Sequence, residues 1–380
     1  MWIRSSIEWA NKNFCKEVLF MGIGMRQQLE AFAYWRRLLL AAPCGQELWG
    51  LDGATETKLM NQAPLYALGQ ERVDFYMEAP LLGKTQVDLS AQYFAEAFAE
   101  GNPLQGLEVE QEGDFFYFYA KELATCKHQL LQHCNLYLEA DIASEGEPKV
   151  APFINLSGDF VQELLPSVLA YRGRLGQLQP VRALLEKVKE WCEPWHFGFM
   201  ESRDIRPLRL VLILKQGLQD LAKVLECIDA PPIPKEGREL LENIDALGIF
   251  KFMLDVDVLA DGSLGETIGV ELIPQEAIFP ATQQQLVAKP AFARLRELLE
   301  EARIADQRME GLVNTIIAAP ISADIYIYSR ISHFKLRWQA GEALPAKVYL
   351  QMRPVQRQNC LNEALGYAKV LQKREVNHHE

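Results

Sequence analysis

Pairs of short segments with alternating polar and apolar residues recur along this chain, and two helical segments separate most successive pairs. The clearest pair is HFKLRWQAGEALPAKVYLQM at 333–352, where a turn containing Gly341 joins two strands. Side chains alternate across a strand, so one face of this hairpin is polar and the other is apolar. The polar face carries His333, Lys335, Arg337, Lys347, Tyr349 and Gln351, and the apolar face carries Phe334, Leu336, Trp338, Val348, Leu350 and Met352.

The same hydrophobic periods predict the other elements of the chain. Five further strand pairs are expected at 72–79 with 84–90, 107–111 with 114–121, 135–142 with 150–156, 196–200 with 207–215, and 251–259 with 267–273. Helices are expected near 25–42, 91–100, 121–133, 159–171, 180–192, 217–228, 235–246, 290–303, 306–318 and 359–373.

The repeated order of helix, strand, strand and helix restricts the fold. Parallel βαβ winding would place one strand between crossovers rather than two. Closing the sheet would remove its edges and would bury one face of each hairpin under helices. We therefore predict an α+β fold of repeated α-β-β-α units, in which an antiparallel, barrel-like sheet is surrounded by helices.

The chain has 380 residues, which is compatible with one large domain, and we expect a single repeat-barrel domain over residues 25–380. The Pro-rich segment IDAPPIPKEG (228–237) lies between two helices of the same rhythm, so it is interpreted as a loop. Met21 and Met25 are both potential alternative starts, and residues 1–24 are treated as an N-terminal segment of uncertain structure.

Composition excludes several partners. The formal net charge of −12 would repel nucleic acid and anionic membranes, so neither is expected as a partner. The seven cysteines are scattered without zinc spacing, which predicts no metal site and a reducing, cytoplasmic environment. The opening stretch lacks an apolar core of signal-peptide length, and no segment approaches the length of a membrane-spanning helix.

If helices cover the apolar faces, the opposite faces of the strands point into a lumen that carries charges of both signs. In KFMLDVDV, the alternation sends Lys251, Met253, Asp255 and Asp257 inward. Other strands place further polar residues on one face, namely Asp74, Tyr76 and Glu78; Asn135, Tyr137, Glu139 and Asp141; and Arg209. Buried charges are costly unless they are paired or bind something, so we expect ion pairs, water or a polar ligand in the lumen.

Lys-x-Arg at 335–337 and Lys-x-Tyr at 347–349 stand on paired strands, and this arrangement resembles the strand motifs of the ABBA prenyltransferases. The repeat order matches that family over roughly residues 70–375. The resemblance implies a ten-stranded antiparallel barrel in which Lys, Arg and Tyr side chains hold an allylic diphosphate. It also implies a transferase that moves the prenyl group to an aromatic or peptide side-chain acceptor in natural-product tailoring, without a metal or other cofactor.

Roles for individual residues follow from this resemblance and from the chemistry of prenyl transfer. Cations must neutralise the leaving diphosphate, and aromatic faces must shield the allylic cation. The expected diphosphate-binding residues are Arg209, Lys251, Lys335, Arg337, Lys347 and Tyr349, and the expected shielding aromatics are Tyr76 and Tyr137. Glu78, Glu139 or Asp255 would act as the catalytic carboxylate that takes a proton from the acceptor.

Two features depart from the family pattern. The sequence predicts six strand pairs where the family has five, and the inner faces are rich in acidic residues, including Asp141, Asp257 and Glu271. An acidic lumen could instead bind a cationic peptide or a metal ion. The alternatives are therefore a lyase or cyclase that modifies a ribosomally made peptide without a prenyl donor, or a non-catalytic barrel that binds a peptide or another ligand.

Overall fold

The computed structural model describes residues 23–66, 73–94, 135–142, 149–156, 159–200, 205–275 and 280–356. The N-terminal segment expected at 1–24 lies outside these ranges except for its last two residues. The strand pair expected within 107–121 and the helices expected at 121–133 and 359–373 also lie outside the described residues.

The described strands form one antiparallel sheet in the order β11-β1-β2-β3-β4-β5-β6-β7-β8-β10-β9, and β10 also pairs with β11. This last pairing closes ten strands into a barrel, while β9 extends the sheet beyond the closed ring. The strands are β1 (Val73–Pro80), β2 (Asp88–Tyr93), β3 (Leu136–Asp141), β4 (Lys149–Asn155), β5 (Cys192–Phe199), β6 (Leu208–Leu214), β7 (Phe250–Val258), β8 (Leu264–Pro274), β9 (Ile317–Pro320), β10 (Ile325–Gln339) and β11 (Glu342–Gln356).

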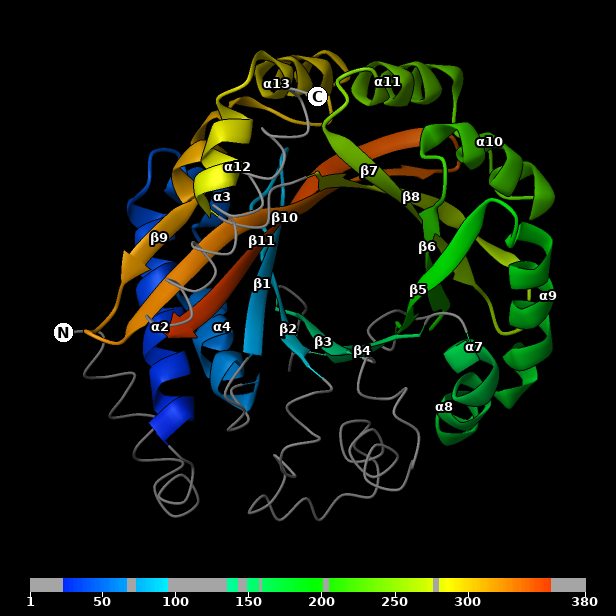
Figure 1. Cartoon of the computed structure of the whole chain (residues 1–380), viewed down its shortest axis with the longest axis horizontal. Helices are drawn as coiled ribbons and strands as arrows, with labels where there is room; N and C mark the ends of the chain where they lie inside the picture. The colour runs from blue at the N-terminus through cyan, green and yellow to red at the C-terminus, as the bar shows by residue number, and fades with distance from the viewer. Residues whose placement is uncertain are drawn as a thin grey trace, which may run out of the picture.

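Helices surround this barrel on its outer side, which confirms the predicted α+β architecture (Figure 1). The α-helices are α2 (Ile23–Ala41), α3 (Gly45–Trp49), α4 (Gly53–Tyr66), α7 (Asp159–Glu163), α8 (Leu165–Tyr171), α9 (Leu178–Val188), α10 (Leu218–Cys227), α11 (Lys235–Asp245), α12 (Pro280–Val287) and α13 (Pro290–Glu301). Two 3₁₀ helices are η3 (Leu175–Gln177) and η4 (Gln307–Thr315).

Some predicted elements differ from the structure. The helix expected at 91–100 is wrong at its start, because β2 continues through Tyr93. The helix expected at 306–318 is the 3₁₀ helix η4, and β9 follows it. Helices α3, α4 and α12 were not expected; α3 and α12 are only five and eight residues long, which gives a weak periodic signal.

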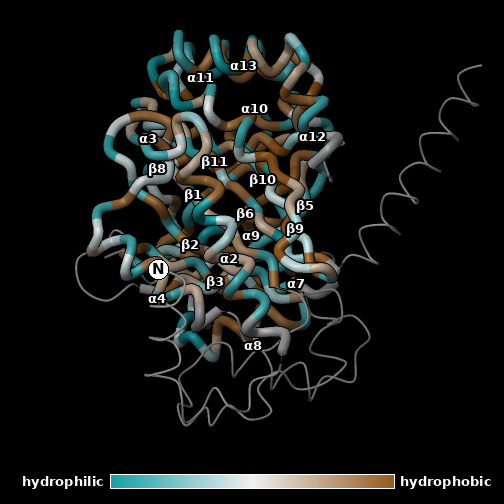
Figure 2. Tube along the Cα trace, turned by 90° about the vertical axis from the view of Figure 1, so that its left-hand side faces the viewer, coloured by the Kyte–Doolittle hydropathy of each residue, from teal (hydrophilic) through white to brown (hydrophobic). Residues whose placement is uncertain are grey.

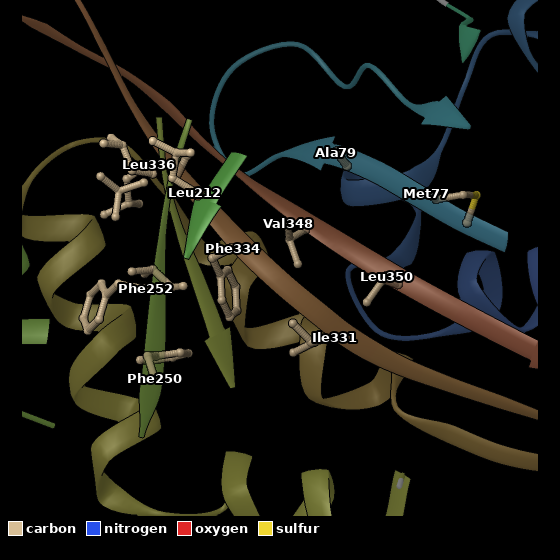
Figure 3. Close-up of a cluster of buried hydrophobic side chains, with 14 of the residues drawn as sticks. Met77, Ala79, Leu212, Phe250, Phe252, Ile331, Phe334, Leu336, Val348 and Leu350 are labelled. Carbon is tan, nitrogen blue, oxygen red and sulfur yellow. The ribbon is translucent and has the colours of Figure 1, made fainter. Parts of the chain in front are cut away.

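The hydrophobic core lies between the outer face of the barrel and the helices. Phe334 and Leu336, from the apolar face of the hairpin, are fully buried there with Leu212 (Figure 3). Leu254 is also fully buried, and Leu138 is half-buried. In Figure 2 the hydrophilic parts of α11 and α13 lie away from the strands. Helix α11 packs closely on β10, since a Cβ atom at Gly237 would stand 2.6 Å from Trp338 Nε1.

The β10–β11 hairpin is the longest antiparallel pair, with 15 residues in each strand. Its turn places Ala340 and Gly341 at positive φ (49° and 83°), as a two-residue turn that matches the twist of the strands requires. The register shifts between Ile331 and His333, so the strand carries a bulge at Ser332. In the described part of the chain, no helix combines the length and apolarity needed to cross a membrane.

Candidate active site

A cavity of about 180 Å³ lies inside the barrel, and each of the ten strands of the closed ring contributes to its wall. Its lining combines aromatic rings with a small number of charged side chains. Sites for drug-sized ligands usually enclose roughly 300–1,000 Å³. The cavity is smaller, so it suits a small ligand or one side chain of a larger one.

Aromatic rings from several strands line one part of the cavity. The Tyr76 and Tyr137 rings lie 6.2 Å apart between centroids, and Tyr137 meets His196 edge to face at 4.7 Å. His333 stacks on Tyr349 with centroids 4.0 Å apart. Burial raises the pKa of both Tyr137 and Tyr349 well above the usual range, so both phenols keep their protons.

A glycine in β5 makes room for another aromatic ring of this wall. Gly198 is paired with Phe153 of β4, and a Cβ atom at Gly198 would stand 2.2 Å from the Phe153 ring. The Phe153 ring therefore occupies the space that a larger residue at 198 would fill, and it lines the cavity from there.

Two cations face the cavity from β6 and β10, and both are paired with carboxylates. Arg209 binds Asp257 through two hydrogen bonds of 2.9 and 3.0 Å. Lys335 forms a close ion pair with Asp255, and its Nζ atom lies 3.4 Å from Glu271 Oε1. Such pairing is what makes these charges tolerable inside the barrel.

A second glycine accommodates the pair between Lys335 and Asp255. A Cβ atom at Gly269 would lie 3.0 Å from Asp255 Cβ and 3.1 Å from Lys335 Cε. Burial, with the nearby Glu271 carboxylate, raises the pKa of Asp255 to about 6, against the opposing effect of Lys335. Asp255 therefore takes up a proton at a higher pH than an ordinary aspartate does.

A hydrogen-bond network behind the cavity wall fixes the Tyr76 phenol. Arg353 binds Asp74 with a shortest contact of 2.6 Å, and the Gln351 amide donates to Asp74 at 2.5 Å. The Gln351 amide also donates to the Tyr76 hydroxyl at 2.9 Å, and this hydroxyl donates to Gln92 at 2.6 Å. With its hydroxyl held from two sides, the Tyr76 ring keeps one orientation toward the cavity.

An acidic group lies on β2 and β3. Glu139 lines the cavity, and Asp88 and Asp141 are close enough to interact with one another. Burial raises the pKa of Asp88 well above its usual range, and the charges of Asp141 and Glu139 add to the effect. The protonated form of Asp88 is therefore favoured relative to that of an ordinary aspartate.

The structure brings most of the predicted site residues together. Six of them line the cavity: Tyr76, Tyr137, Glu139, Arg209, Lys335 and Tyr349. Asp255 is buried behind this surface against Lys335, and Glu78 is buried in a close ion pair with Lys347. Arg337 is half-buried next to this region, whereas Lys251 is exposed and does not line the cavity.

Sequence reasoning missed Trp195 and His196, which both line the cavity although they are consecutive. The register between β5 and β6 shifts from Pro194 to His196, and this bulge brings both side chains to one face. The predicted strand began only at residue 196. The available signal was Pro194, since proline within a sheet is confined to edges, strand starts and bulges.

The sequence predicted two departures from the family pattern, a sixth strand pair and an excess of acidic residues on the inner faces. Five strand pairs close the barrel, and the sixth expected pair, within 107–121, falls outside the described residues. Of the acidic residues on the inner faces, Asp74, Glu78, Asp255 and Asp257 each pair with a basic side chain. The acidic excess is thus largely neutralised within the wall.

No family model matches this sequence, and no curated protein matches it. Solved structures do. AnaPT from Neosartorya fischeri superposes with a TM-score of 0.55 at 11% identity, covering 92% of this chain and 97% of that one. NotF in complex with brevianamide F and DMSPP gives 0.54 at 13% identity, covering 89% and 96%. The 5-dimethylallyltryptophan synthase from Streptomyces coelicolor gives 0.52 at 10% identity, covering 85% and 97%.

These identities establish a shared fold rather than a shared activity. The neighbours cover nearly the whole chain, and the ten-stranded closed barrel with outer helices is the architecture that the motifs at 335–337 and 347–349 implied. The chain therefore has the fold of the ABBA prenyltransferases.

Proposed function

We propose that this protein transfers a prenyl group from an allylic diphosphate to an aromatic or peptide side-chain acceptor in natural-product tailoring. The observation that carries this proposal is the cavity itself, whose lining combines aromatic rings with the cations Arg209 and Lys335. Neighbours of the same fold include a dimethylallyltryptophan synthase and a PriB complex with product diphosphate.

The diphosphate would bind on the side of β6 and β10. Lys335 and Arg209 face the cavity there, with the Tyr349 hydroxyl as a further donor. Arg337 follows Lys335 on the same face, and its Nε atom is buried without a hydrogen bond to any described residue. A buried guanidinium nitrogen that lacks a partner is costly, so an anion that satisfied it would bind favourably.

The allylic cation would form among the aromatic rings. When the C–O bond to the diphosphate breaks, the positive charge on the allyl group is stabilised by ring faces within about 6 Å. Tyr76, Tyr137 and Tyr349 supply such faces, with Phe153 and Trp195 as further apolar cover. A bound donor and acceptor that filled the cavity would keep water from the cation, which water would otherwise capture as an alcohol.

The new bond to the acceptor releases a proton, and a carboxylate would accept it. Among Glu78, Glu139 and Asp255, Glu139 is the one that lines the cavity, so we assign it this role. Asp255 is held by Lys335, and Glu78 by Lys347. These two carboxylates would instead position the cations that meet the diphosphate.

The test is incubation of the protein with dimethylallyl diphosphate and a panel of acceptors: tryptophan, indole, a phenol and short aromatic peptides. The expected result is a prenylated product together with released diphosphate. Arg337→Ala should lower turnover strongly, whereas Arg238→Ala, an exposed arginine on α11, should leave it unchanged. Absence of product with every acceptor, in protein shown to be folded, would contradict the proposal.

One observation favours a non-catalytic ligand-binding barrel as the second candidate. The basic residues Arg209, Lys335, Lys347 and Arg353 are each neutralised by a carboxylate of the wall, so a neutral or cationic guest would meet no excess positive charge. This function predicts that short basic peptides raise the melting temperature while allylic diphosphates do not.

A further inference from the structure

The bulge in β5 brings His196, which the proposed mechanism does not use, to the cavity beside Trp195. Pro194 pairs with Leu212 and His196 pairs with Val211, so Trp195 is the extra residue of the bulged strand. Trp195 and His196 both line the cavity, and their rings meet at 5.5 Å with an interplanar angle of 67°. Bulges next to active sites commonly redirect a side chain.

The two ring nitrogens of His196 have different surroundings. Nδ1 is shielded and has no hydrogen-bond partner among the described residues. Nε2 makes no hydrogen bond to those residues either, and it is not among the shielded atoms. Because buried N–H groups without a partner are rare, the proton belongs on Nε2, which leaves Nδ1 as the shielded acceptor. His196 therefore offers an N–H donor to the cavity.

The surroundings of the His196 ring favour an anionic oxygen as its partner. Burial lowers the pKa of His196 to about 3, with further lowering by His333 and Lys335, so the ring is neutral at pH 7. Arg209 lies on the adjacent strand, paired with Gly198 two residues along. His196, Arg209 and Lys335 all line the same cavity. An anionic oxygen that Arg209 and Lys335 bind would therefore lie in the cavity that His196 also faces.

We propose that His196 is a further diphosphate-binding residue, whose Nε2–H donates a hydrogen bond to an oxygen of the anion beside Arg209 and Lys335. This inference rests on the proposed function, because it names a further contact to the same donor. The β5 bulge would then have a role in binding, because it would place the neutral donor His196 beside the positively charged Arg209 and Lys335.

The experiment is calorimetric titration with inorganic pyrophosphate of the wild type and three variants. His196→Phe keeps a ring but removes the donor, and its affinity should fall about tenfold, as expected for a lost hydrogen bond to a charged group. His196→Gln places an amide N–H near the position of Nε2 and should stay within about threefold of the wild type. Glu193→Gln is the matched control, because Glu193 is exposed on the same strand.

The outcomes separate this inference from the function on which it rests. If the wild type does not bind pyrophosphate at millimolar concentration, both are overturned. If the wild type binds and His196→Phe binds equally well, only the role of His196 is overturned. ¹⁵N NMR of the wild-type histidines tests the inference without any variant. We expect a proton on Nε2 of His196 and a shift of the Nε2 signal when pyrophosphate is added. A proton on Nδ1 would contradict the inference.

Discussion

The two histidines that line the cavity should make the folded state sensitive to acid. Burial lowers the pKa of both His196 and His333 to about 3, whereas an unfolded chain leaves them near the ordinary value of 6.5. Between these values the unfolded state binds protons that the folded state does not. Stability is therefore fully present above pH 6.5 and is lost as the pH falls toward 3.

The size of the effect follows from the same two values. Between pH 7 and pH 5, protonation of one unfolded histidine lowers the free energy of unfolding by about 1.9 kcal/mol, so the pair contributes about 4 kcal/mol. The double variant His196→Gln, His333→Gln removes both groups. Asp255, whose raised pKa acts in the opposite direction, is common to both proteins, so its contribution largely cancels in the comparison.

The assay is urea unfolding at pH 7 and pH 5, followed by tryptophan fluorescence. The wild type should lose about 4 kcal/mol more than the double variant over this interval, whatever their absolute stabilities. If the two proteins lose stability in parallel, the histidines are protonated in the folded state, and burial does not lower their pKa as described.

Three further predictions concern packing and catalysis. Leu254→Ala and Leu336→Ala remove fully buried side chains and should each cost roughly 2–5 kcal/mol in denaturant unfolding, and losses below about 1 kcal/mol at both sites would contradict the described packing. Gly198→Ala should cost roughly 1–3 kcal/mol because its Cβ would meet the Phe153 ring, and an unchanged melting temperature would refute this reason. Glu139→Gln should lower kcat by about 100-fold or more while donor affinity is retained, and an unchanged kcat would remove Glu139 as the proton acceptor.

The alternation of side chains along the strands predicted which residues share the inner face of the sheet. It did not predict how deeply each of them is buried. Lys251 and Asp255 share one face of β7, but Lys251 is exposed and Asp255 is fully enclosed. A period of two fixes the face of a side chain, whereas its position along the barrel axis depends on the stagger between strands, which a single sequence does not encode locally.

The ion pairs inside the barrel could not be predicted from the sequence either. Asp74 meets Arg353 across 279 positions of the chain, and Lys347 meets Glu78 across 269, so only closure of the barrel brings these charges together. Bulges also limit prediction, because one extra residue changes the face on which the following side chains stand. The extra residue at Ser332 lets both Arg330 and His333 stand on the polar side of β10, which strict alternation would forbid.

Calorimetric titration with dimethylallyl diphosphate tests most directly whether the barrel cavity binds an allylic diphosphate. We expect saturable binding below millimolar concentration. Arg337→Ala should weaken this binding by about 10-fold or more, and the exposed-site control Arg238→Ala should not change it. Absence of binding by the wild type, or equal weakening by both variants, would contradict the proposed function.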